Sequence, residues 1–520
     1  MLGGPVVLCI LDGVGWGRRD GGDAVAMADT PNLDALCRTV PWTLLAAHGT
    51  AVGMPSDEDM GNSEVGHCAM GAGRIFDQGA KLVRNAIASG DIWTSEAWTK
   101  ATQRKTLHLI GLASDGNVHS HIDHLRAMIV RAANEGVKRL RVHILTDGRD
   151  VSPRSAMTWV QPLEALLAES PGDYAIGSGG GRMSITMDRY EADWPMVERG
   201  WKTHVLGEGR RFDTASDAIQ TLYDENPAAN DQNLPAFIVG DYGGMEDGDA
   251  AVLFNFRGDR AIEICQAFDS EDFPHFDRGR NPEVFFAGMM QYDGDLQVPQ
   301  SFLVEPPAID NTVGEQLESA GVRSLAISET QKFGHVTYFF NGNRSERRPT
   351  ETWEEIPSLQ VPFDQAPTMC AESITDRAVV AIRSGEFDHI RLNLANGDMV
   401  GHTGVVEATV QAVACIDDAV GQLMAAVKAK GGVLLVTADH GNADQMFGIH
   451  KSTGEYTHQP HTSHSLNPVP FWVYAPEHTI KLSVPSGPTV SGSIAQIGGS
   501  LLSLFDIPLP HDYLPSLLER

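Results

Sequence analysis

Short apolar runs alternate along the chain with segments of helical periodicity. Seven runs have the length and composition of buried parallel strands: residues 6–11, 107–113, 140–145, 250–255, 284–289, 389–395 and 433–438. Between many of them, apolar residues recur at three- and four-residue spacing, most clearly over 122–135 and 407–430. Because strands and helices alternate, we predict an α/β fold.

Clusters of glycine and proline interrupt this pattern at two places. Residues 71–74 read Gly-Ala-Gly-Arg and residues 304–308 read Val-Glu-Pro-Pro-Ala, and a helix-like segment follows each, at 81–89 and 313–319. Such clusters separate structured segments, so both are candidate hinges. The length of 520 residues by itself suggests about three domains, at roughly 100–200 residues per domain.

Composition narrows the classes of function. Hydrophobic residues make up 42% of the chain, enough for a packed core and too many for a disordered protein. The chain has 39 Lys and Arg against 68 Asp and Glu, a formal net charge of −29. Nucleic-acid binding requires a surplus of cations, so we expect no nucleic-acid partner. A small anionic substrate would need a local cluster of cations or bound metal.

The first residues carry no sign of a secretory leader. Residues 1–12 lack the basic segment and the small-residue cleavage site of a signal peptide. No apolar run approaches the roughly 20 residues that span a bilayer. We therefore expect a soluble, cytoplasmic protein without a membrane partner.

Carboxylates and imidazoles follow three of the predicted strands. They are Asp12 after 6–11, Asp398 and His402 after 389–395, and Asp439 and His440 after 433–438. Ligands of open α/β sheets bind at the carboxyl ends of the strands, where these side chains would meet. Mixed carboxylate and imidazole ligands suit divalent ions, and His464 is a further candidate. The alternative is that Asp12 and Asp439 are helix N-caps.

Ser63 is a candidate nucleophile in the segment 61–67, Gly-Asn-Ser-Glu-Val-Gly-His. At a helix start, backbone amides would stabilise an anion beside it. The spacing is not the G-x-S-x-G of an α/β-hydrolase, and a capping role for this serine is the alternative. A nearby metal would activate its hydroxyl, so the metal candidates and Ser63 support each other.

Arginines follow other predicted strands. These are Arg149 in 147–150, Arg182 after three glycines, Arg189 in 187–191, and Arg257 and Arg260 in 255–260. Guanidinium groups match carboxylate and phosphate bidentately, which indicates a small substrate that carries both groups. The alternative is a set of ion pairs with the neighbouring Asp150, Asp188 and Asp259. His119 is a further candidate contact to substrate.

Together these segments resemble the cofactor-independent phosphoglycerate mutases, nearly end to end. The resemblance rests on residues 11–17, 61–67, 114–121, 147–150, 255–260, 328–333, 397–404, 439–442 and 461–470. Residues 181–191 look more like the plant and trypanosomatid branch than the common bacterial one. The resemblance implies an alkaline-phosphatase-like metal domain, residues 1–77 and 310–520, and an inserted α/β substrate-binding domain, residues 78–309.

The resemblance also implies a pair of divalent ions and no 2,3-bisphosphoglycerate. One ion would be held by Asp398, His402 and His464, and the other by Asp12, Ser63, Asp439 and His440. Manganese is the expected ion, with magnesium or cobalt as alternatives, because such donor sets accept several divalent metals.

By the same resemblance, the enzyme interconverts 3-phosphoglycerate and 2-phosphoglycerate through a phosphoserine at Ser63. Substrate contacts would come from His119, Arg149, Asp150, Arg182, Arg189, Arg257, Arg260 and Lys332. Asp150 would exchange protons with the glycerate hydroxyls, and Lys332 would offset charge on the phosphoryl oxygens. We expect a monomer, since such a site is self-contained.

Two departures from the family pattern stand out, and neither removes a proposed ligand. Ser184 replaces a frequent aromatic residue, and Val405 with Val406 replaces a polar pair. Two other functions remain open from the residues: a metal-dependent phosphatase or other phosphomutase of the alkaline-phosphatase superfamily, and a non-catalytic sensor of metal or phospholipid with the same fold.

Overall fold

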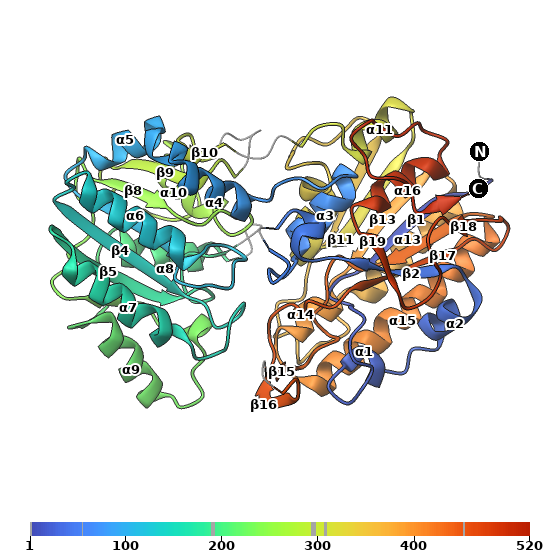
Figure 1. The fold of residues 1–520 in the computed structure, drawn as a ribbon, viewed down its shortest axis with the longest axis horizontal. Coiled ribbons are helices and arrows are strands. Elements are labelled where there is room, and N and C mark those ends of the chain that lie inside the picture. Colours follow the sequence, from blue (N-terminus) through green and yellow to red (C-terminus); the bar gives the residue numbers. More distant parts are fainter. Residues whose placement is uncertain are drawn as a thin grey trace. The chain divides into compact units, whose positions relative to one another are not determined.

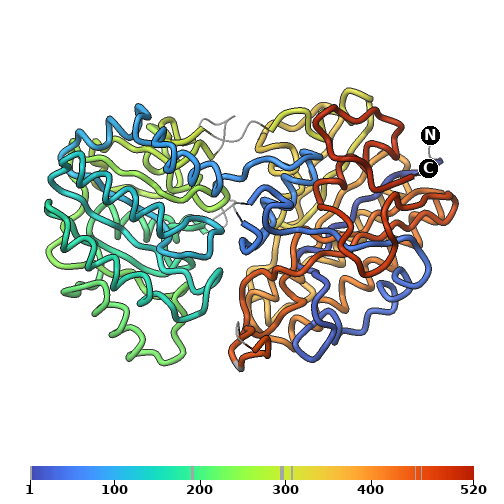
Figure 2. Tube along the Cα trace, viewed as in Figure 1, coloured from blue at the N-terminus to red at the C-terminus, as the bar shows by residue number. Residues whose placement is uncertain are grey.

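The computed structural model describes residues 3–54, 56–188, 193–292, 298–305, 309–450 and 453–519. The chain divides into two compact units: unit 1 is Met1–Gln78 with Ala308–Arg520, and unit 2 is Gly79–Pro307. Figure 2 follows the chain by colour, with its blue start and its orange-to-red end in unit 1. Unit 2 is thus inserted into unit 1. The first candidate hinge, 71–74, contains the end of a helix of unit 1, and residues 306–308 of the second lie outside the described part.

Unit 1 contains an eight-stranded sheet and its covering helices (Figure 1). The eight strands of this sheet are β1 Val6–Leu11, β2 Trp42–Ala46, β11 Ser324–Glu329, β12 Glu351–Ile356, β13 His389–Leu394, β14 Val433–Thr437, β17 Val469–Tyr474 and β19 Val490–Ser493. Two further pairs form two-stranded sheets, β15 Phe447–Ile449 with β16 Tyr456–Pro460 and β18 Lys481–Leu482 with β20 Leu518–Glu519. Its helices are α1 Ala24–Met27, α2 Pro31–Thr39, η1 Gly49–Val52, α3 Ser63–Ala72, α11 Val313–Ser319, α12 Thr330–Gly334, η4 His335–Phe339, α13 Ala371–Ser384, α14 Asn396–Gly401, α15 Val406–Ala429 and α16 Gln496–Leu504.

The central strands of this sheet are parallel and fully buried. The strand order is β12-β11-β13-β1-β14-β17-β2-β19, and neighbours from β12 to β14 pair in parallel. All six residues of β1 are buried. Helices α2, α13 and α15 pack together in one group and α3, α11 and α16 in another. A parallel sheet is stable only when helices cover its faces, which explains the continuous apolar runs.

Unit 2 contains a second eight-stranded sheet. Its strands are β3 Leu107–Leu112, β4 Arg139–Thr146, β5 Asp173–Gly181, β6 Arg210–Phe212, β7 Phe237–Val239, β8 Ala250–Leu253, β9 Phe285–Met290 and β10 Phe302–Val304. Its helices are α4 Gly79–Ser89, η2 Asp91–Thr94, α5 Glu96–Thr102, α6 Ile122–Asn134, α7 Ala156–Glu169, α8 Trp194–His204, α9 Ala215–Glu225, η3 Asp231–Asn233 and α10 Ile262–Asp269. The strand order is β10-β9-β8-β3-β4-β5-β7-β6, and β10 to β5 pair in parallel.

The predicted α/β class is confirmed, and each of the seven apolar runs is a strand. The predicted ends differ by a residue or two. Strand β8 stops at Leu253, short of the predicted end at 255. Beyond Leu253, the N–H of Leu112 in the neighbouring β3 donates to the side-chain Oδ1 of Asn255 at 2.9 Å. A side chain thus replaces the backbone partner that would have continued the pairing of the two strands. The pattern missed β2 and β17, which lie inside the sheet, and the edge strand β19, in which apolar residues are few.

Helix α15 corrects the expectation that no segment is long and apolar enough to cross a membrane. Its 24 residues include an 18-residue window of mean hydropathy 1.3, and half of that window is buried inside unit 1. The buried Asp417 of this helix accepts the N–H groups of Asn32 and Leu33 at the start of α2. By length and composition α15 could cross a membrane, but the core helices of folded proteins have the same length and composition.

Candidate active site

The metal candidates of unit 1 meet at the carboxyl ends of three adjacent strands. Asp12 follows β1 directly, Asp439 and His440 follow β14, and Asp398 lies in α14 directly after β13. These strands are neighbours in the order β13-β1-β14. Two groups of candidate ligands form here, and within each group the ligand atoms lie within 4.8 Å of one another. One group is Asp398, His440 and His464, and the other is Asp12, Asp439 and His440, so His440 belongs to both.

Asp398 is the centre of the first group. Its Oδ1 lies 3.0 Å from Nε2 of His402 and 3.3 Å from Nε2 of His464. His402 donates its other ring nitrogen, Nδ1, to the carbonyl of Thr462 at 2.5 Å. This arrangement, with the second imidazole nitrogen tied to a carbonyl, is typical of histidines that ligate metals.

The second group surrounds Ser63. Its Oγ lies 2.9 Å from Nε2 of His440 and 3.4 Å from Oδ1 of Asp12. Nδ1 of His440 faces the carbonyl of Gly441 at 3.2 Å, the same arrangement as in His402. The donor set of both groups, carboxylate, imidazole and hydroxyl, fits divalent ions such as Mn²⁺, Mg²⁺ or Co²⁺.

Lys332 lies between the two groups. It comes from α12, and its Nζ donates to Asp12 Oδ1 and to Asp398 Oδ2, each at 2.7 Å, and to Ser63 Oγ. The side chain is buried, as are those of its three partners. Lys332 is therefore a contact of the nucleophile candidate and of one ligand from each metal group.

Burial of so many charges perturbs their ionisation. Burial and the neighbouring Asp439 raise the pKa of Asp12 to about 6, against the opposing effect of Lys332. Burial also opposes ionisation of Asp398, but His402 and Lys332 outweigh it and hold that pKa well below its usual range. Three buried carboxylates share one ammonium group here, and this excess of negative charge favours bound cations.

Local backbone geometry places Ser63 at this position. Asn62 caps α3, since its side chain accepts the N–H of Val65, and Ser63 is the first helical residue. A Cβ on Gly66 would lie 2.7 Å from Cβ of Asp439. Glycine at this position thus lets the first turn of α3 approach the end of β14 closely, which carries the serine to the ligands.

Two supporting residues were missed by the sequence analysis, His67 and Asn393. His67 Nδ1 donates to the carbonyl of Ser63 at 2.8 Å, and its Nε2 lies 3.2 Å from Nδ2 of Asn393. Asn393 Nδ2 also donates to Asp12 Oδ2 at 2.6 Å. A signal existed for both: His67 follows Ser63 by four residues, one helical turn, and Asn393 is a polar residue inside an apolar strand run.

The second predicted set lies in unit 2, also at carboxyl ends of parallel strands. His119 follows β3, Arg149 and Asp150 follow β4, Arg182 follows β5, and Arg257 and Arg260 follow β8. These four strands are adjacent in the order β8-β3-β4-β5. Arg189 lies outside the described residues. Lys332 belongs to unit 1 and contacts Ser63, apart from this set.

Asp147 organises one side of this set and was not singled out from the sequence. Its Oδ1 accepts the N–H of Asp150 at 3.0 Å, the N–H of Arg149 at 3.2 Å and Nη1 of Arg182 at 2.8 Å. Its Oδ2 accepts the hydroxyl of Ser114 at 2.6 Å. Arg182 also pairs with Asp150, and it is only 1% exposed. Burial opposes its charge, but Asp150 and Asp147 outweigh that and raise the pKa of Arg182.

Asp259 has the corresponding position on the other side. Its Oδ1 lies 3.0 Å from Nε of Arg257 and 3.6 Å from Nδ1 of His119. Arg260 Nη1 donates to the carbonyl of Met187 at 2.7 Å. The ion-pair interpretation of these arginines therefore holds in part, for Arg257 with Asp259 and for Arg182 with Asp150. Arg182, Arg257 and Arg260 are buried, however, and Arg149 is half-buried, so these four side chains are not simple surface ion pairs.

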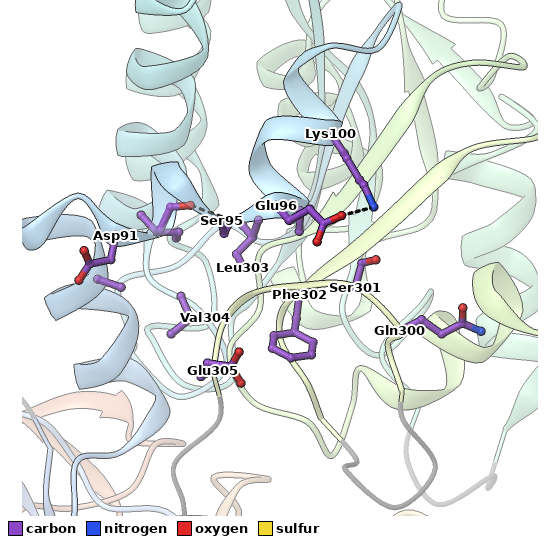
Figure 3. Close-up of a pocket in the computed structure, with 13 residues that line it drawn as sticks. Asp91, Ser95, Glu96, Lys100, Gln300, Ser301, Phe302, Leu303, Val304 and Glu305 are labelled. Carbon is purple, nitrogen blue, oxygen red and sulfur yellow. Dashed lines mark hydrogen bonds and ion pairs between the residues drawn. The ribbon is translucent and has the colours of Figure 1, made fainter.

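Unit 2 also has a cavity of about 470 Å³ that none of these residues line. It lies among α4, η2, α5 and the segment around β10, and Figure 3 shows Glu96 directed toward Lys100 beside it. Nζ of Lys100 lies 2.7 Å from Oε1 of Glu96, and both side chains are exposed. The cavity is thus distinct from both strand-end sets.

Comparison with known proteins agrees with the geometry. A family model of the metalloenzyme superfamily matches residues 4–509. A probable 2,3-bisphosphoglycerate-independent phosphoglycerate mutase of Leptospira interrogans is 51% identical over 99% of this chain and 97% of that protein. A 2,3-bisphosphoglycerate-independent phosphoglycerate mutase of Trypanosoma brucei is 47% identical over 99% of this chain and 97% of that protein.

A solved structure is similar over the whole chain as well. It is the phosphoglycerate mutase of Leishmania mexicana at low cobalt concentration, with a TM-score of 0.96, 46% identity, and coverage of 99% of this chain and 98% of that one. The resemblance carried by the sequence motifs is therefore confirmed. The chain belongs to the family of 2,3-bisphosphoglycerate-independent phosphoglycerate mutases, within the metalloenzyme superfamily.

Proposed function

We propose that the chain interconverts 3-phosphoglycerate and 2-phosphoglycerate in glycolysis and gluconeogenesis, with Ser63 as the transient acceptor of the phosphoryl group. One observation carries the proposal. The Ser63 hydroxyl lies at the start of a ten-residue helix, within hydrogen-bond distance of Lys332 and His440 and 3.4 Å from Asp12. A hydroxyl surrounded by a cation and by metal-type ligands is placed for nucleophilic attack on phosphorus.

Two divalent ions complete this site in the proposal, with manganese as the first candidate and magnesium or cobalt as alternatives. Asp398, His402 and His464 would hold one, and Asp12, Ser63, Asp439 and His440 the other. When bound, such ions lower the pKa of the serine hydroxyl and neutralise charge on the phosphoryl oxygens. His67 and Asn393 would keep Ser63 and Asp12 oriented toward them.

The proposed reaction has two transfers. Ser63 Oγ, in its deprotonated form, makes a bond to phosphorus as the bond to the 3-oxygen of the substrate breaks, and Asp150, in its carboxylic acid form, gives its proton to that leaving oxygen. After the glycerate reorients, the Asp150 carboxylate takes the proton of the 2-hydroxyl, whose oxygen attacks phosphorus as Ser63 leaves as the alkoxide. Lys332 Nζ, which already donates to Ser63 Oγ, offsets the negative charge that develops at each transfer.

Unit 2 would bind the phosphoglycerate. Its predicted contacts are His119, Arg149, Asp150, Arg182, Arg189, Arg257 and Arg260, and the described arginines among them offer forked donors to carboxylate and phosphate. The proposal therefore assigns residues 78–309 to a substrate-binding domain and residues 1–77 with 310–520 to a metal and phosphotransfer domain.

The remaining parts of the proposal concern the setting of the enzyme. We infer a cytoplasmic monomer without nucleic-acid or membrane partners. The net charge of −29 supports the absence of nucleic-acid binding. Within this acidic chain, the arginines of unit 2 and the metal ions of unit 1 would supply the local positive charge that a phosphoglycerate needs.

The test uses the full chain, stripped of metal with a chelator. Manganese, magnesium and cobalt are added back separately with 3-phosphoglycerate, and products are followed by ³¹P NMR. We expect 2-phosphoglycerate only in the metal-loaded samples and without added 2,3-bisphosphoglycerate; the chelated enzyme supplied with 2,3-bisphosphoglycerate is the control. Inorganic phosphate as the main product would identify a phosphatase instead. No turnover with any metal would favour the non-catalytic sensor.

A further inference from the structure

Unit 2 contains a buried chain of hydrogen-bonded side chains that the proposed reaction does not use. We call it the histidine chain, and its members in order are Asp249, His108, His143, Ser178, His204 and Thr186. The successive distances are 3.2, 2.9, 2.7, 2.8 and 3.0 Å. All six residues are at most 3% exposed. A continuous polar chain in a packed core is costly unless every member is satisfied, as it is here.

The sheet itself builds this chain. His108 lies in β3, His143 in β4 and Ser178 in β5, three adjacent parallel strands. The register of β4 and β5 shifts by one residue at His143, so Ser178 and not Gly177 is its partner. This bulge turns the Ser178 hydroxyl toward His143. Helix α8 then contributes His204 at its last residue, next to Ser178.

The hydrogen bonds of the histidine chain have one consistent direction. Asp249 is a carboxylate, so His108 donates to it and must accept from His143. His143 then accepts from Ser178, whose oxygen accepts from His204. The last imidazole nitrogen, Nε2 of His204, accepts the hydroxyl of Thr186. Each histidine is therefore neutral with one defined tautomer.

Burial agrees with this assignment. It lowers the pKa of His108, places that of His143 well below its usual range, and lowers that of His204 to about 3. Burial opposes ionisation of Asp249, yet the hydrogen bonds from His108 and from the backbone of Glu246 lower its pKa. The carboxylate end and the neutral imidazoles thus persist at neutral pH.

Thr186, at the other end, has an unusual backbone. Its φ is +70°, a left-handed conformation that β-branched residues avoid. It lies in the turn between β5 and α8, residues 182–188, and a Cβ on Gly200 would come 2.2 Å from its Oγ1. Strain of this kind persists only where the surroundings impose it. The hydrogen bond from its hydroxyl to His204 is one such restraint, and close packing of α8 is another.

The same turn carries parts of the proposed substrate site. Arg182 begins it, and the carbonyl of Met187, next to Thr186, accepts Nη1 of Arg260 at 2.7 Å. Ile185 and Met187 pack against Leu112 and Leu145 at the carboxyl ends of β3 and β4. The conformation of Thr186 therefore determines where Arg182 and the partner of Arg260 lie.

We infer that the histidine chain is a positioning device, which holds Thr186 in its left-handed conformation and so sets the β5–α8 turn for phosphoglycerate binding. This inference rests on the proposed role of unit 2 as the substrate-binding domain. None of the chain residues touches the reacting atoms in this account. Their effect is on how well the arginines meet the substrate.

The test compares steady-state kinetics of the full, manganese-loaded enzyme and its variants with 3-phosphoglycerate. Thr186→Val keeps the shape and the strain but removes the hydroxyl, and His143→Phe interrupts the chain far from the turn. We expect each to raise KM about tenfold, with kcat changed less than about twofold. His511→Phe, at an exposed histidine of unit 1, is the matched control and should leave both constants unchanged.

A double-mutant cycle separates positioning from a merely structural role. Glycine takes positive φ without strain, so Thr186→Gly should keep KM within about threefold of the parent and remove the need for the chain. In that background, His143→Phe should no longer raise KM, although it still lowers the melting temperature.

Specific results would overturn the inference. One is an unchanged KM in Thr186→Val; another is a KM increase by His143→Phe that persists in full beside Thr186→Gly. If His143→Phe does not fold, the KM values of Thr186→Val and Thr186→Gly still test the inference, because it predicts a raised KM for the first and a nearly unchanged KM for the second. A parent enzyme that binds no 3-phosphoglycerate would instead refute the proposed function, an outcome distinguishable from both.

Discussion

The two units build their sites on the same architectural principle and with opposite charge. In unit 1, the ends of β13, β1 and β14 present three carboxylates and imidazoles around a single lysine. In unit 2, the ends of β8, β3, β4 and β5 present arginines, with Asp147, Asp150 and Asp259 among them. In both units the parallel sheet provides a binding position at the carboxyl ends of its strands. The residues that follow each strand decide whether this position attracts cations or anions.

The two sites also differ in what supports them. Ser63 and Asp12 are held by His67 and Asn393, short side chains on adjacent elements. The arginine set is held by Asp147 from within and by the histidine chain, which crosses three strands before it reaches the turn. In unit 1 the side chains that position the site lie next to it, whereas in unit 2 they extend through the core of the sheet. Mutations in the two units should therefore have different effects on stability and activity.

The largest expected effect is at the proposed nucleophile. If Ser63 accepts the phosphoryl group as proposed, Ser63→Ala removes that acceptor, so we expect mutase activity to fall by about 10⁴-fold or more. Metal binding should be retained in part, because the carboxylates and histidines remain. Coupled-assay kinetics and calorimetric manganese titration measure the two quantities. Ser319→Ala, at an exposed helix position with a hydroxyl bonded only to Glu315, is the control; appreciable activity in Ser63→Ala would contradict the assignment.

The next effect concerns the buried ion pairs of unit 2. Arg182→Met leaves Asp147 and Asp150 buried without their guanidinium partner, which should destabilise the fold by about 3–5 kcal/mol. The midpoint of urea-induced unfolding reports this loss. Arg199→Met, whose side chain is half exposed, should change stability by less than about 1 kcal/mol. Equal midpoints for both variants would show that burial of Arg182 has no energetic consequence.

In unit 1, the corresponding support should matter less for stability and more for metal binding. His67→Gln loses the ring that joins Ser63 to Asn393, so we expect activity or manganese affinity to fall about 10–100-fold. Activity measured over a range of manganese concentrations separates the two. His450→Gln, at an exposed position of unit 1, is the matched control. A His67→Gln variant with the manganese affinity and the activity of the parent would contradict a supporting role for His67.

The last prediction concerns the dependence of stability on pH. Burial lowers the pKa of His204 to about 3, and those of His108 and His143 are also lowered. The unfolded chain then binds more protons, so stability is full above the unfolded pKa of about 6.5 and falls with pH below it. Each histidine should contribute up to about 1.4 kcal/mol per pH unit until its folded pKa is reached.

Unfolding titrations between pH 7 and pH 4, at a fixed manganese concentration, measure this slope. His204→Gln should make it shallower by about one proton. His389→Gln provides the comparison in unit 1, since burial lowers the pKa of His389 to about 3 as well. A slope that is unchanged in both variants would mean that each of these histidines binds the same number of protons in the folded and unfolded states.

Much of the fold was predictable, for a physical reason visible in particular strands. Residues 6–11 form a continuous apolar run because both faces of β1 are covered, and the pattern of β14 has the same cause. The strands that face less protein, such as β19, have weaker patterns and were missed. The long helix α15 reads as membrane-like by composition because the sequence does not say that neighbouring helices cover it.

Site residues that follow a strand end were predictable from the sequence, and those within strands were not. Asp12, Asp439 and Arg182 directly follow buried strands, so their convergence follows from the α/β pattern itself. Asn393 was missed because it lies within β13, and only its hydrogen bond to Asp12 reveals its part. Lys332 was expected near substrate, and the structure places it against Ser63.

The sequence by itself determined the fold class, the family and the residues that follow each strand, because apolar periodicity and motif spacing are local properties. Tertiary structure alone decided which of these residues share a site and what supports them. Pairing across strands depends on register, and one bulge beside Gly177 makes Ser178, not its neighbour, the partner of His143. A shift of one residue exchanges the two faces of a strand, so no local pattern could have predicted the histidine chain.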